Sequence, residues 1–197
     1  MKRDYLLPGI LSILLAILFP VYFVLVIYTR LDSDSASTVL DPKFDFYSWL
    51  FLFIGAVSIY LYLYFKKILN DQLNFKSIDI LLLLMVINSV IFFVGVFITD
   101  VLSYFGQAEA WTTFGIHILS ISCMIIFGVL DIIIGIILLA NHSKTPVFLT
   151  ILAAISILLG LFEVSIVYSA ASIIIFPLYL IFLAIYFLRT PETIEVV

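Results

Sequence analysis

The sequence predicts an all-α integral membrane protein, a polytopic bundle of six transmembrane helices with both the N and C termini in the cytoplasm. Of its 197 residues, 65% are hydrophobic and 11% are charged, whereas soluble domains are usually about half apolar and about a quarter charged. The apolar residues form six long blocks separated by short polar segments. A chain of this length cannot bury so much apolar surface in its own core, so lipid must solvate much of it.

Each apolar block is expected to form one transmembrane helix, and residues 1–197 are expected to form one transmembrane domain. The expected helices cover residues 6–28, 47–66, 79–99, 113–140, 147–168 and 171–188. Most reach the ~20 residues needed to cross a hydrocarbon core. Helices are favoured over barrel strands because the blocks are continuously apolar and do not alternate with period two.

The first block is expected to be retained as a helix and not cleaved as a signal peptide. The basic start Met1-Lys2-Arg3 followed by apolar sequence is typical of both. The apolar run continues to about Tyr28, however, and the apolar region of a signal peptide has only ~7–15 residues.

The distribution of basic residues predicts the orientation. With six spans, Lys2, Arg3, Lys66, Lys67, Lys76, Lys144 and Arg189 share one side, and Arg30 and Lys43 share the other. Cytoplasmic loops carry the excess of lysine and arginine, so the side of the termini is expected to be cytoplasmic. We expect a plasma (inner) membrane, with the lipid bilayer as the main partner.

One face of the expected helix 113–140 is polar and small. It consists of His117, Ser120, Met124, Gly128, Asp131 and Gly135, spaced three or four residues apart. A carboxylate at the depth of Asp131 costs about 2.5–3.5 kcal/mol on insertion scales, so it is expected to face the bundle interior or water. Two readings of Asp131 remain: a proton, cation or ligand site, or a protonated acid that serves helix packing.

The expected helix 147–168 carries a matching face. Ala153, Ser156, Gly160 and Glu163 follow at spacings of 3, 4 and 3 residues. The six-residue link 141–146 makes this helix an antiparallel neighbour of the helix before it. Gly128, Gly135, Ser156 and Gly160 are then helix-packing positions.

His117 and Glu163 are expected at similar depth in these two helices, which predicts a hydrogen bond or ion pair between them. Such a pair suits a proton relay or a ligand site open to the outside, but we favour a polar contact that only fixes helix packing.

Two further features concern the first and third helices. Asn88 lies mid-span in helix 79–99, close to the expected depth of Asp131. It could donate to a protonated carboxyl group or serve as an interhelical hydrogen bond. Gly9, Ser12 and Ala16 form a small-residue face for packing within the bundle or against a partner subunit.

Several kinds of site are not expected. The sequence has no phosphate-binding glycine loop, no His-Glu-x-x-His pair and no Gly-x-Ser-x-Gly elbow. Cys123 is its only cysteine. We therefore expect no enzyme activity, metal or cofactor. Nucleic-acid binding is not expected either, because the chain has no basic run to follow phosphates.

Two classes of function remain. In the first, the protein binds or transports a small solute or ion through a polar interior lined by the third to fifth helices. In the second, it is a non-catalytic accessory or assembly subunit that contacts partner membrane subunits or a second copy of itself. We favour the first, because polar groups on three helices can converge. These groups are Asn88, His117, Asp131 and Glu163.

Overall fold

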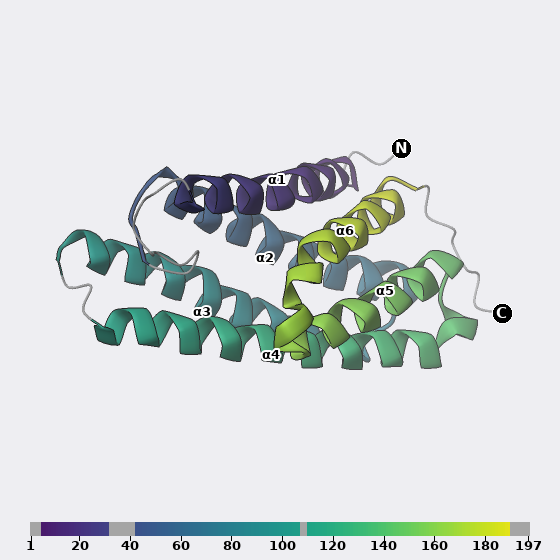
Figure 1. Ribbon diagram of the computed structural model, residues 1–197. Coiled ribbons are helices and arrows are strands. Elements are labelled where there is room, and N and C mark those ends of the chain that lie inside the picture. Colours follow the sequence, from purple (N-terminus) through teal and green to yellow (C-terminus); the bar gives the residue numbers. More distant parts are fainter. Residues whose placement is uncertain (1–4, 32–41, 107–109, 190–197) are drawn as a thin grey trace.

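The computed structural model describes residues 5–31, 42–106 and 110–189, and within these ranges the chain is helical and contains no strand. Six helices are long and apolar enough to cross a membrane (Figure 1). The predicted number and type of elements are therefore confirmed for the described residues.

The six long helices follow the six apolar blocks in order. They are α1 (Leu6–Leu31), α2 (Phe46–Leu73), α3 (Asp79–Tyr104), α4 (Ala110–Ala140), α5 (Val147–Val164) and α6 (Ser172–Leu188). Two short 3-10 helices connect the last three: η2 (His142–Lys144) and η3 (Ile166–Ala171).

Helix α2 is longer than expected. It continues to Leu73, so Asn70 and Asp71, which the expected end at residue 66 leaves in a loop, lie in the helix. The extra turns are anchored by polar contacts to the start of α3. The Asn70 amide donates to Asp79 Oδ2 at 2.9 Å, and Lys66 Nζ lies 3.8 Å from the same oxygen. Asn74 caps the end of the helix, and its left-handed conformation (φ 48°) is one that asparagine tolerates well.

Helix α5 is shorter than expected. It ends at Val164 and not at residue 168, and the chain then forms the 3-10 turn η3 before α6 begins. The connection is therefore a six-residue 3-10 helix, whereas the expected helices 147–168 and 171–188 leave only two residues between them. As a result, Glu163 lies in the last turn of α5.

The helices pack as a layered bundle in which α1, α2 and α6 lie above α3, α4 and α5 in the view of Figure 1. Helices α1 and α6 run antiparallel: the backbone of Gly9 meets the side chain of Leu188, and the rings of Phe19 and Phe176 are 4.8 Å apart. The start of α1 and the end of α6 therefore lie at one end of the bundle. The small-residue face of α1 is buried within the chain, with Ser12 0% exposed.

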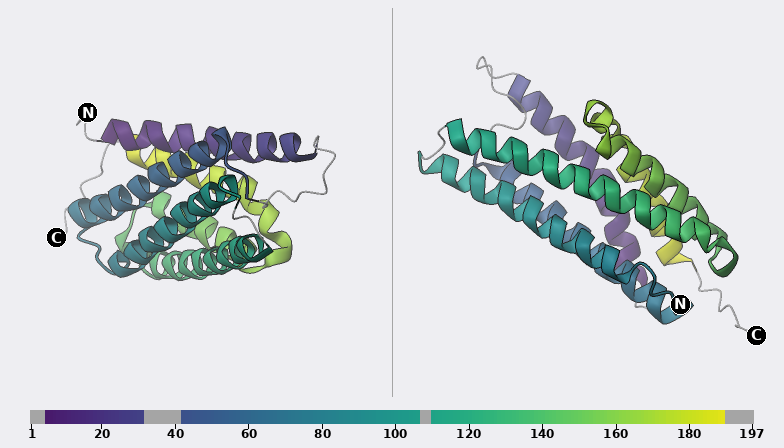
Figure 2. Two further views of the ribbon diagram at one scale, coloured as in Figure 1. Left: turned by 90° about the vertical axis from the view of Figure 1, so that its left-hand side faces the viewer. Right: turned by 90° about the horizontal axis from the view of Figure 1, so that it is seen from below.

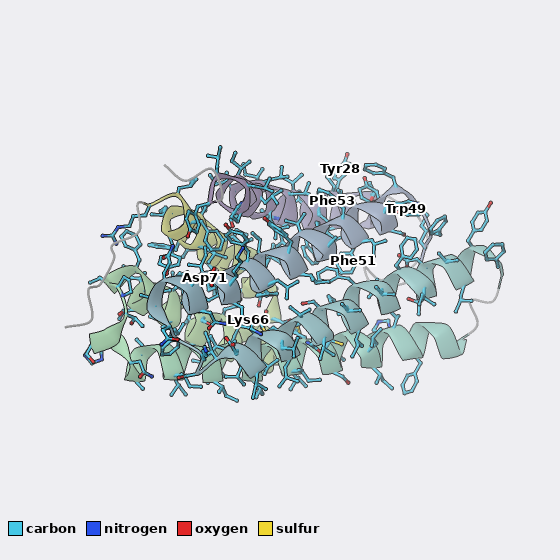
Figure 3. The ribbon with its side chains drawn as sticks, turned by 180° about the vertical axis from the view of Figure 1, so that it is seen from behind. Tyr28, Trp49, Phe51, Phe53, Lys66 and Asp71 are labelled. Carbon is cyan, nitrogen blue, oxygen red and sulfur yellow. The ribbon has the colours of Figure 1, made fainter. Side chains whose placement is uncertain are left out.

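The core consists of apolar side chains from all six long helices, and its largest members include Phe65, Met85 and Phe187, each 1% exposed. Figure 3 shows Tyr28 and Phe53 on the outside, where their exposed fractions are 69% and 47%. Many aliphatic side chains are equally exposed, which would be costly in water but is compatible with contact to lipid.

Candidate functional site

The α4–α5 interface is built on glycines that let the two backbones meet. A Cβ atom added to Gly128 would lie 2.7 Å from the carbonyl oxygen of Gly160, and one added to Gly135 would lie 2.7 Å from that of Ala153. Both distances are shorter than real Cβ contacts. Close approach of this kind is the usual role of small residues between apolar helices. It brings the polar faces of α4 and α5 together.

Asp131 and Ser156 meet at the centre of this interface. The Ser156 hydroxyl donates to Asp131 Oδ1 at 2.9 Å and lies 3.0 Å from the backbone oxygen of the same residue. Asp131 is 5% exposed and Ser156 is 1% exposed. The carboxyl group is therefore held in one position, away from the surface of the bundle.

Glu163 belongs to the same polar region. It lies seven residues after Ser156, which is two turns or ~10 Å along the same face of α5. Its Oε2 atom is buried and has no hydrogen-bond partner. The glycine contacts place Gly160 and Val164 opposite Gly128, one turn from Asp131, so both acids lie in the same stretch of the interface. The interface thus holds two acidic groups that influence each other.

Two tyrosines complete the region, and sequence reasoning missed both. Tyr62 of α2 and Tyr179 of α6 lie within electrostatic range of Asp131, and Tyr62 also lies within range of Glu163. Tyr179 is 6% exposed. Tyrosine places a hydroxyl group, which can donate and accept, at the end of an apolar body. Four helices therefore surround the two acids. We call Tyr62, Asp131, Ser156, Glu163 and Tyr179 the acidic site.

The sequence provides no lysine or arginine on the helices that carry the two acids. It has no lysine or arginine between Lys76 and Lys144, or between Lys144 and Arg189. Two carboxylates in one desolvated region repel each other, and their ionisation is disfavoured unless a proton or a cation neutralises them. Among the described residues, no three His, Cys, Asp or Glu side chains are grouped to hold a metal ion. The oxygen-only surroundings are of the type that suits protons and hard cations.

The structure separates His117 from Glu163. The glycine contacts place Gly160 and Val164 opposite Gly128, so Glu163 lies beside the turn of α4 around residues 125–128. His117 precedes this turn of α4 by eight or more residues, which is a distance of ~12 Å or more along the helix. The prediction that the two residues share one depth is therefore wrong, because it assumed that α5 crosses the same thickness as α4. His117 lies on the same face of α4 but towards its start.

Asn88 lies at the α3–α4 interface and not in the acidic site. Its amide donates to the backbone oxygen of Cys123 at 2.9 Å. Cys123 precedes Asp131 by eight residues, or ~12 Å along α4. Of the two roles considered for Asn88, the geometry supports the interhelical hydrogen bond.

We predict that replacing Asn88 with leucine lowers the free energy of unfolding by about 1 kcal/mol, because one buried interhelical hydrogen bond is lost. Thermal unfolding of the purified protein in mild detergent measures this. The control is Ser89→Ala, since the equally buried Ser89 hydroxyl bonds only to Met85 of its own helix. Equal stability of the two variants would contradict the prediction.

Comparisons with known proteins place the chain in no family. No family model matches it. No curated protein and no solved structure matches it either. The case for a function therefore rests on the geometry of the acidic site.

Proposed function

We propose that the chain is a multi-pass membrane protein in which protons and a small hard cation compete for the acidic site, so that the protein exchanges one for the other across the membrane. The six apolar helices support insertion into a bilayer. The excess of lysine and arginine on the side of the termini supports a cytoplasmic location for both ends in a plasma membrane.

The observation that carries the proposal is the pair of carboxyl groups in one helix interface, with no lysine or arginine on either helix. Asp131 is almost fully buried, and one oxygen of Glu163 is buried without a donor. Acids inside a membrane bundle are costly and usually mark a path for ions or protons. Binding of a proton or a cation removes the repulsion between the two groups, so either can occupy the site and each displaces the other.

The alternative class, an accessory subunit, is supported by no particular contact. Its main argument was the small-residue face of α1, which could have met a partner. In the structure Gly9 meets Leu188 of the chain's own α6, so this face gives no argument for a partner.

The test is cation-driven proton movement in vesicles. Purified protein is reconstituted into liposomes containing a pH-sensitive dye, and gradients of Li⁺, Na⁺ or K⁺ are imposed in turn. We expect at least one of these gradients to change the internal pH with the unmodified protein. Glu163→Gln, which keeps the shape of the side chain but removes its charge, should reduce the change to that of protein-free vesicles.

The matched control is Asp100→Asn. Asp100 is a buried acid outside the acidic site, and its Oδ1 accepts from the backbone N–H of Lys43, as an amide oxygen also could. This variant should exchange like the unmodified protein. The proposal fails if folded Glu163→Gln exchanges normally. It also fails if the unmodified protein shows no exchange with any of the three cations, and a stoichiometric partner chain in mild detergent would then favour the accessory-subunit class.

A further inference from the structure

Helix α5 covers only part of α4. Its last residues, Gly160 and Val164, lie against Gly128, and α4 continues for 18 residues from Gly128 back to Ala110. This uncovered length is ~27 Å. Figures 1 and 2 show the η3 turn beside the middle of α4. The N-terminal half of α4, which follows α3 in the chain, extends well beyond this turn.

The polar face of α4 does not stop where α5 stops. In the covered half, Gly128, Asp131 and Gly135 are buried, whereas in the uncovered half His117, Ser120 and Met124 are half-buried. Polar side chains that face hydrocarbon are costly, so a helix surrounded by lipid is expected to be apolar on this face. The continuation of the polar face beyond α5 therefore indicates that water reaches it.

Two buried polar atoms without hydrogen-bond partners lie next to η3, the turn at which α5 ends. Glu163 Oε2 stands in the last turn of α5, and Ser172 Oγ stands at the start of α6, on the other side of η3. Buried polar groups are nearly always hydrogen-bonded to protein or water, so both atoms point to an occupant such as water or a hydrated ion.

We infer that the uncovered polar face of α4, formed by His117, Ser120 and Met124, is the path by which water, protons and small cations enter the acidic site. The path starts at the end of the bundle opposite the start of α1 and the end of α6, and Glu163 is the acid of the acidic site that lies nearer to it. This inference rests on the proposed function for the identity of the ion. In the proposed orientation, the entrance faces the outside of the cell.

The experiment measures access to introduced cysteines. Cys123→Ala removes the native thiol and leaves the backbone oxygen that accepts from Asn88. Ser120→Cys and Ser122→Cys are then compared in this background. Both are serine replacements two residues apart, but Ser120 is half-buried on the polar face whereas Ser122 is exposed on the opposite, apolar side.

A membrane-impermeant, positively charged methanethiosulfonate reagent is added to the outside of vesicles in which the termini face inward. We expect Ser120→Cys to react at least about tenfold faster than Ser122→Cys, because only a thiol in contact with water forms the reactive thiolate. A second pair, Met124→Cys and Ile126→Cys, repeats the comparison one turn deeper. It decides the question if the first pair fails to fold.

Two results would overturn the inference. If both members of a pair react at the same high rate, this half of α4 lies in water on all sides and forms no path. If both are unreactive in folded protein, water does not reach this face. Neither result depends on ion exchange, so the path can fail while the exchange assay with Glu163→Gln succeeds. Conversely, rapid labelling at residue 120 together with normal exchange by Glu163→Gln would reject the proposed function and keep the path.

Discussion

Replacing Gly160 with leucine is expected to abolish close packing between α4 and α5 and to give the largest loss of stability of any substitution proposed for this chain. A Cβ atom at this position would strike the carbonyl oxygen of Gly128, and it would lie 2.8 Å from Ile132 Cγ1 and 3.0 Å from the Ile132 backbone nitrogen. Two of these three atoms belong to the backbone, so they cannot rotate away. The helices must therefore separate.

Overpacking in a well-packed core usually costs about 1–3 kcal/mol, and separation of the helices adds the loss of the Ser156–Asp131 contact. We expect a much lower thermal unfolding temperature in detergent and a broad or aggregated elution profile in gel filtration. Gly115→Leu is the control, because a Cβ atom there has nothing within 4 Å. That variant should be as stable as the unmodified protein, or more so by up to ~1 kcal/mol, since leucine favours helix over glycine. Equal stability of the two leucine variants would show that the glycine contact is unimportant.

The sequence was sufficient for the helices but not for all of their ends. Continuous apolar blocks require helix because backbone groups in lipid must bond within their own segment. The end of α2 was missed because Asn70 and Asp71 are polar. A change to polar residues marks where the apolar block ends, but the helix can continue beyond that point. The end of α5 was missed for the opposite reason: apolar Ile166 and Val167 continue the block, although the helix has already become a 3-10 turn.

The sequence identified one side of the acidic site and missed the other. The spacing of Asp131 on α4 and of Ser156 and Glu163 on α5 places each residue on a definite face, and the short link between the helices brings these faces together. Tyr62 and Tyr179 could not be found in this way, because the period of α2 or α6 alone does not say which face turns towards α4. The only available signal for the two tyrosines was their position in the middle of their helices. Tyrosines of membrane helices usually lie near the helix ends, at the membrane–water interface.

Asp131→Asn is expected to leave the fold intact and to abolish ion exchange. Asparagine has nearly the same shape, and its amide oxygen can still accept from the Ser156 hydroxyl, so the free energy of unfolding should change by less than about 1 kcal/mol. The amide, however, can neither take up a proton in the physiological range nor supply a negative charge to a cation. The dye-loaded vesicles should therefore show only the background pH change, although the protein unfolds at a nearly unchanged temperature.

Ser156→Ala should give the reverse pattern, and the pair of variants separates the two readings of Asp131. Alanine removes the hydrogen bond of 2.9 Å but leaves both carboxyl groups in place, so stability should fall by about 1 kcal/mol while exchange continues. If Asp131 serves only helix packing, the variants should differ in stability alone and exchange should be unchanged in both. If Asp131 carries the ion, exchange is lost in the more stable variant and kept in the less stable one. Loss of stability cannot produce that ordering, because it would impair Ser156→Ala first.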